Sequence, residues 1–219
     1  MKSPHFVVMS SAGESSAKSV AWQLEQIRSA IAVWWWWARV DLNKPMTVLA
    51  LKDEAAMKTL APQYWEVKGR VHPSSVWVTR PDQHYVAIRT DVEAKERHNI
   101  NPYFTSYFFY VSLILEQSVD RDLPPWFTRG LAGVMSNTLV HEDEIVVGAP
   151  IPWPLDRLRE RERLPLATLV TLTRDSPEFR TEEGMERFDA QSCPSRGRTR
   201  ARLLQTSRSR NWSTSCAPT

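Results

Sequence analysis

The first 192 residues of this 219-residue chain contain no cysteine, because Cys193 and Cys216 both lie near its end. A disulfide framework for the core is therefore excluded, and no Cys-x-x-Cys spacing for a metal or redox site exists. Only seven residues are glycine, and they form neither a Gly-rich phosphate loop nor a Gly-x-Ser-x-Gly elbow. These absences argue against a P-loop nucleotide enzyme and against a serine hydrolase of the elbow type.

Long apolar runs are also missing. No stretch approaches the roughly 18 apolar residues that a membrane-spanning helix needs, and the chain opens with Met1-Lys2-Ser3-Pro4 and no export signal. We therefore expect no transmembrane segment, and the compartment stays open. A chain of 219 residues with 42% hydrophobic content is nevertheless long enough to bury a substantial core.

Negative charge is absent from the C-terminal segment, residues 193–219, which contains six arginines and no acid. Subtracting those six charges from the net charge of +3 leaves −3 for residues 1–192. The basic balance thus belongs to the tail, which makes nucleic acid an unlikely ligand of the body. The tail is rich in Ser, Arg and Pro, so we expect it to be disordered, with a short helix possible at 199–205.

The first ninety residues alternate between strand and helix patterns. Apolar residues at Val20, Leu24, Ile27 and Ile31 keep helical spacing within a long helix. The predicted elements are a strand at His5–Met9, a helix from Ser15 to about Trp36, a strand at Pro45–Leu51, a helix at Glu54–Leu60 capped by Asp53, and a hairpin of Val76–Thr79 with Tyr85–Ile88. This pattern predicts a small mixed sheet with one long helix.

Helices dominate from Asn101 onward. We predict a helix at Tyr103–Leu115 that is apolar almost all round, a helix from Pro124-Pro125 to about Ser136, a short strand at Ile145–Gly148, a charged helix at Leu155–Arg163 and a short helix starting at Pro165. The fold class is therefore α+β, with one domain over residues 1–192 and the tail at 193–219.

Several blocks of the body resemble a bacterial family of unknown function that has a peptidase-MA-like, gluzincin-type domain. The blocks are Ser3-Pro4-His5-Phe6-Val7-Val8, Val20 to Arg28, Lys52-Asp53-Glu54, Pro62 to Glu66 and Asn101-Pro102-Tyr103. The resemblance runs from about residue 2 to Ser192 and implies a zincin-like fold. Active relatives would use zinc, and members of the family usually look exported.

The resemblance also implies two active-site helices, of which this chain has kept none of the chemistry. The family's first helix carries His-Glu-x-x-His, which supplies two zinc ligands and a general base; those positions here are Phe108, Phe109 and Ser112. The second helix normally carries Glu-Gly-Leu-Ala-Glu, and here it begins with Arg129 and ends with Gly133. We therefore predict no catalytic residue, no metal ligand and no cofactor.

A cation at position 129 would oppose a zinc ion as well as fail to bind it. Arg129 could instead replace the metal electrostatically by pairing with a carboxylate, which the sequence alone does not identify. The five histidines share no ligand spacing, and we expect them to be surface or supporting groups; they are His5, His72, His84, His98 and His141.

Four consecutive tryptophans, Trp34 to Trp37, cannot all face one core, so we expect one or two to be partly exposed. They suggest a platform for a partner, peptide or sugar, but we favour a helix end wedged between the sheet and neighbouring helices, because singly exposed aromatic residues are common. The abrupt change of composition at Cys193 also raises the hypothesis that the tail arises from a shifted reading frame.

Three classes of function follow. The first is a non-catalytic metallopeptidase-like protein, either a pseudoenzyme or a gene relic. The second is a zinc-dependent hydrolase that uses an unrecognised site. The third is a binding module that uses Trp34 to Trp37 or the basic tail, with a peptide or protein as the partner.

Overall fold

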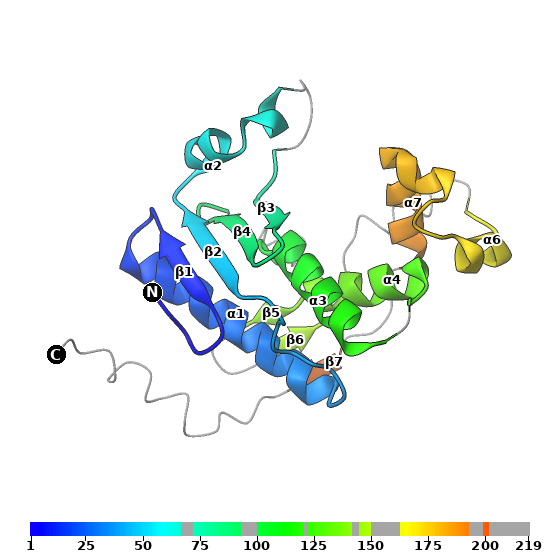
Figure 1. The fold of residues 1–219 in the computed structure, drawn as a ribbon, viewed down its shortest axis with the longest axis horizontal. Helices are drawn as coiled ribbons and strands as arrows, with labels where there is room; N and C mark the ends of the chain where they lie inside the picture. The colour runs from blue at the N-terminus through cyan, green and yellow to red at the C-terminus, as the bar shows by residue number, and fades with distance from the viewer. Residues whose placement is uncertain are drawn as a thin grey trace.

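The computed structural model describes residues 1–66, 72–92, 100–120, 122–141, 145–149, 163–192 and 199–201. Figure 1 shows a sheet on one side of the molecule and a group of helices on the other. Among the described residues, no helix combines the length and the apolar character that crossing a bilayer requires.

The main sheet contains four strands in the order β1-β2-β4-β3. Their bounds are Val7–Ser10 for β1, Met46–Leu51 for β2, Ser75–Thr79 for β3 and His84–Arg89 for β4. Strands β1, β2 and β4 are parallel, whereas β3 pairs with β4 in antiparallel fashion. The predicted small mixed sheet and its hairpin are therefore confirmed, with β3 as one edge strand.

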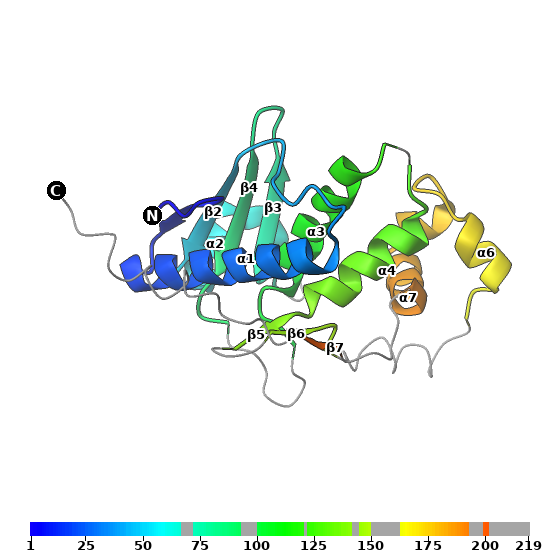
Figure 2. The same ribbon diagram turned by 90° about the horizontal axis from the view of Figure 1, so that it is seen from below.

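Helix α1 (Glu14–Trp34) lies along one face of this sheet, as Figure 2 shows from below. Its buried residues include the predicted Val20, Leu24, Ile27 and Ile31. These side chains pack against sheet residues such as Val48 and Val86 in the main core. The period of 3.6 in the sequence therefore located the buried face of α1 correctly.

Helix α2 (Glu54–Leu60) packs on the opposite face through Met57, which lies with Val76 and Ala87 in a second apolar cluster. Asp53 caps this helix as predicted, because its Oδ1 accepts a hydrogen bond of 2.9 Å from the Ala56 amide. A 3-10 helix, η1 (Pro62–Trp65), follows directly.

The helical half begins with α3 (Phe104–Ser118) and α4 (Pro125–Ser136), which lie side by side in both views. The sequence of α3 is apolar almost all round, which favours a buried helix, but the structure buries only one side of it. Tyr107, Tyr110 and Ile114 are in the core, but Phe109 is 41% exposed. The reason is that α3 has the sheet and α1 on one side and a groove on the other.

Helix α7 (Glu182–Ser192) was not predicted, and it packs against α4. Phe188 of α7 is fully buried in a third apolar cluster with Leu169 and Leu172. Helix α6 (Leu166–Thr171) begins after Pro165 as predicted, and the 3-10 helix η2 (Pro177–Arg180) connects it to α7.

A second sheet has three strands in the order β5-β6-β7. Their bounds are Leu139–Val140, Ile145–Val147 and Thr199–Ala201. Strand β6 matches the prediction, but residues 199–201 are a strand rather than a helix or a disordered segment, because β6 offers them a partner. The predicted charged helix at Leu155–Arg163 lies outside the described residues except for Arg163, which is not helical.

Candidate functional site

Four of the five predicted former-site positions line one groove of about 310 Å³, which we call the α3–β3 groove. Phe108, Phe109 and Ser112 come from α3, and Arg129 comes from α4. The other lining residues come from these two helices, from β3 and from the segment between α6 and α7: Trp77, Thr79, Leu113, Glu116, Pro125, Thr128, Arg174 and Phe179. The fifth position, Gly133, is buried within α4 and does not line the groove.

Aromatic rings cover the α3 side of the groove. The ring of Phe109 stacks on Trp77 of β3, with centroids 5.8 Å apart and planes inclined by 27°. Phe108 meets Phe109 edge to face at 6.0 Å. The hydroxyl of Ser112 donates a hydrogen bond of 2.8 Å to the Phe108 carbonyl one turn earlier. Phe108 and Phe109, two of the positions that the resemblance assigns to catalysis, thus form an apolar wall.

Arg129 has a carboxylate partner, which is Asp189 on α7. Its Nε donates to Oδ1 at 2.5 Å and its Nη2 donates to Oδ2 at 2.6 Å, so the contact is bidentate. The guanidinium also lies over the ring of Phe108, 5.2 Å from the centroid. The two side chains are 27% and 26% exposed, so water reaches the pair only in part. A planar, always-charged group satisfied in this way is well suited to a half-buried position.

These residues do not fit a zinc ion. A structural or catalytic zinc site needs three or four thiolate, imidazole or carboxylate ligands. Among the five positions only Ser112 has a side-chain oxygen, and it is a neutral hydroxyl. Arg129 adds a cation at the place where the resemblance expects a ligand carboxylate. Within the described part of the chain, no group of three His, Cys, Asp or Glu side chains could hold a metal ion.

A second cavity of about 680 Å³ adjoins the groove, because both are lined by Glu116, Thr128 and Arg174. We call it the acidic cavity, since its other charged lining residues are Asp120 and Asp122. Glu116 accepts an ion-pair contact of 2.9 Å from Arg174 at the boundary between the two cavities.

His84 lies close to the groove at the first residue of β4 and is only 6% exposed. Its ring centroid is 6.0 Å from that of Trp77, and its Nδ1 is 3.2 Å from the Thr79 hydroxyl oxygen. Burial lowers the pKa of His84, and the positive charge of Lys44 lowers it further, while Glu116 acts in the opposite direction. The imidazole is therefore held neutral beside the groove.

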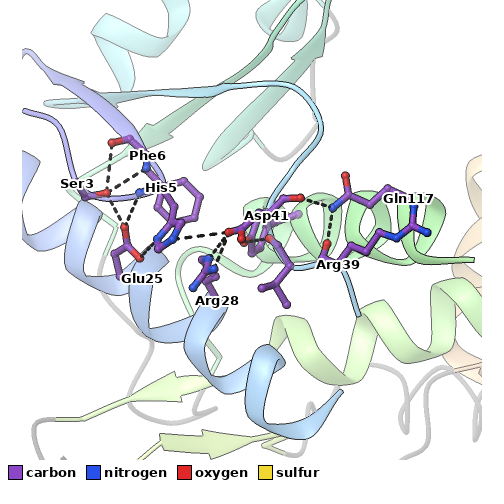
Figure 3. A network of polar contacts seen from close by, with 10 residues as sticks. Ser3, His5, Phe6, Glu25, Arg28, Arg39, Asp41 and Gln117 are labelled. Carbon is purple, nitrogen blue, oxygen red and sulfur yellow. Dashed lines mark hydrogen bonds and ion pairs between the residues drawn. The ribbon is translucent and has the colours of Figure 1, made fainter. Parts of the chain in front are cut away.

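The described histidines are dispersed, as predicted. Figure 3 shows His5 between two carboxylates: its Nδ1 is 2.7 Å from Glu25 Oε2 and its Nε2 is 3.7 Å from Asp41 Oδ1. Arg28 also binds Asp41, and Gln117 of α3 donates to the Asp41 carbonyl at 2.8 Å. This network connects the first residues of the chain to α1 and α3, and its role is structural.

The remaining described histidines also lie far apart in the fold. His72 contacts Glu54 near α2, and His141 is exposed after β5. His98 lies outside the described residues.

The tryptophan cluster is divided between core and solvent, as expected. Trp35 is buried and Trp36 is 87% exposed, while Trp37 stacks on Trp35 at 5.8 Å. None of the four lines the groove or the acidic cavity. The end of α1 is therefore anchored in the core by Trp35, and whether Trp36 meets a partner stays a prediction.

Asp189 is the site residue that sequence reasoning missed. Its helix carries apolar residues at Met185 and Phe188, a weak helical pattern among charged neighbours. Recognising that pattern would have placed Asp189 on a helix, but it would not have shown that α7 packs against α4.

Comparisons with known proteins add no family assignment. No family model matches the sequence, and a search of curated proteins finds no match. The resemblance to a peptidase-MA-like domain therefore depends on the sequence blocks quoted above.

Proposed function

We propose that this chain is a non-catalytic, metallopeptidase-like protein that binds an extended peptide in the α3–β3 groove. The observation that carries the proposal is the Arg129–Asp189 ion pair over Phe108. It puts a satisfied guanidinium at a position where the resemblance expects a zinc ligand. A zincin-like origin of the scaffold belongs to the proposal as well.

The free edge of β3 supports peptide binding. The amide of Arg80 donates to Gln83 and that of Arg89 donates to Ser74, so the even-numbered residues of β3 face β4. Because hydrogen-bonding direction alternates in an antiparallel pair, the N–H and C=O groups of Trp77 and Thr79 point away from the sheet. Within the described residues, no backbone partner engages them. An edge strand with free backbone groups beside a groove is a template for an added strand.

The test is the zinc content of the purified full-length chain, compared with a variant that carries Phe108→His, Phe109→Glu, Ser112→His and Arg129→Glu. We expect no bound zinc in the natural chain and about one zinc per chain in the variant, because three ligands then converge between α3 and α4. Circular dichroism of both proteins establishes that the variant is folded.

A matched control carries Phe108→His and Ser112→His but retains Arg129, and it should bind zinc far more weakly. Stoichiometric zinc with chelator-sensitive peptide hydrolysis in the natural chain would overturn the proposal in favour of an active hydrolase. If the variant with all four substitutions folds but binds no zinc, the proposal of a metallopeptidase-like scaffold is contradicted.

A further inference from the structure

We propose that the occupant of the groove is a peptide that combines an aromatic side chain with a basic side chain about four residues away. This inference depends on the proposed function, because it specifies the ligand of the same groove. It derives from the way the α3–β3 groove and the acidic cavity adjoin along α3.

The aromatic end is at Trp77 and Phe109. Their stacked rings leave Phe109 41% exposed at the groove surface. An incoming aromatic ring can stack on this pair or meet it edge to face, and such ring contacts stabilise a complex beyond the burial of apolar area. Apolar surface next to a free strand edge favours a strand-forming peptide over a small polar ligand.

The basic end is at the acidic cavity. Of its four charged lining residues, three are acids and one is Arg174, which is already bound to Glu116. Asp120 and Asp122 are exposed, and neither forms an ion pair with any described residue. A lysine or arginine side chain complements this charge, whereas a nucleic acid or an anionic lipid would be repelled.

The spacing follows from the helix. From Phe109 to the last residue of α3, Ser118, is nine residues, or about 14 Å at the α-helical rise. An extended chain covers that distance with roughly four residues. A peptide that pairs with β3 from Trp77 toward Thr79 runs toward Glu116, which lines both cavities, and its basic residue then reaches Asp120 and Asp122.

The experiment selects a random octapeptide display library on the immobilised full-length chain. The expected outcome is enrichment of peptides with an aromatic residue and, about four positions away, Lys or Arg. Affinities of the enriched synthetic peptides are then measured by fluorescence anisotropy. Phe109→Ser should weaken binding about three- to ten-fold, as loss of one ring contact predicts.

The paired change Asp120→Asn with Asp122→Asn should weaken binding by a similar factor at low salt and by less at high salt, because exposed charges are screened. The control is Glu66→Gln, which removes the charge of an exposed residue that lines neither cavity, and it should leave binding unchanged. A peptide with N-methyl groups on alternate amides should lose affinity if it adds to β3.

The outcomes separate the two proposals. Enriched peptides that need their backbone amides but lack the aromatic–basic pattern would overturn this inference and leave peptide binding intact. Failure to enrich any peptide would overturn both. Zinc bound by the natural chain would overturn the non-catalytic assignment whichever peptides are selected.

Discussion

Arg129 brings a permanent charge into the groove, and the residues around it accommodate that charge. Asp189 accepts two hydrogen bonds along one edge of the guanidinium, from Nε and Nη2, while Phe108 covers one of its faces. The ring of Phe108 could not ligate a metal, but it is a favourable surface for a cation. Phe108 and Arg129 are therefore mutually compatible in the folded chain.

A double-mutant cycle tests this consistency. We expect Arg129→Ala and Asp189→Ala each to lower the free energy of unfolding by about 1–2 kcal/mol, since each leaves a half-buried partner without its hydrogen bonds. The double variant should lose less than the sum, with a coupling energy near 1 kcal/mol because the pair is about one-quarter exposed. Urea unfolding of the four proteins measures it.

The matched control for this cycle is the exposed pair Arg174–Glu116, whose side chains are 74% and 49% exposed. Its coupling should be close to zero. If the Arg129–Asp189 pair couples no more strongly than this control, the ion pair has no role in holding α7 to α4.

At the scale of elements, the contact between α4 and α7 depends on a glycine. A Cβ on Gly130 would lie 2.3 Å from the carbonyl oxygen of Ser192, which is backbone and cannot move aside as a side chain does. The two helices can therefore approach closely only because position 130 has no side chain. This approach is what brings Asp189 within reach of Arg129.

Gly130→Ala should therefore destabilise the chain, by about 1–3 kcal/mol, through overpacking. In an open helix position the same change would stabilise the protein by up to about 1 kcal/mol, so the sign of the effect is diagnostic. Thermal or urea unfolding measures it, and Thr128→Ala on the same helix is the control. A stabilised Gly130→Ala variant would mean that α7 does not pack on α4 in solution.

At the scale of the whole molecule, stability should depend on the protonation of His84. Burial lowers the pKa of this imidazole in the folded state. The unfolded chain takes up the proton as the pH falls below about 6.5, whereas the folded chain resists it. The unfolded state therefore binds more protons, and stability falls with acidification.

The prediction is a loss of unfolding free energy between pH 7.5 and 5.5, at up to about 1.4 kcal/mol per pH unit for one proton. His84→Gln should flatten this dependence and leave the lower-pH effects of carboxylates such as Asp91 in place. Urea unfolding at intervals of half a pH unit measures both curves. Parallel curves for the two proteins would show that His84 does not titrate differently in the two states.

Much of the fold was predictable from local patterns. The strands of the main sheet, the buried face of α1, the Asp53 cap and the hairpin all follow from periodicity and turn residues. The predictions failed, or were not made, where the structure of a segment depends on residues far away in the sequence. Residues 199–201 pair with β6, and α7 is stabilised by burying Phe188.

The candidate site was predictable as a set of positions but not as an arrangement. The resemblance pointed to Phe108, Phe109, Ser112 and Arg129, and the structure brings all four to one groove. The contribution of Trp77 required the position of β3, and the acidic cavity required the packing of the segment that contains Arg174. Neither depends on residues close together in the chain.

The sequence by itself determined the α+β class, the long helix beside a mixed sheet and the absence of any imidazole or carboxylate at positions 108, 109, 112, 129 and 133. These properties depend on residue type and on spacing within one element. The tertiary structure alone decided that Asp189 neutralises Arg129, that Gly130 admits α7, and that an aromatic groove adjoins an acidic cavity. Such contacts join residues up to 62 positions apart. Residue type and spacing within one helix or strand do not show which other element packs against it.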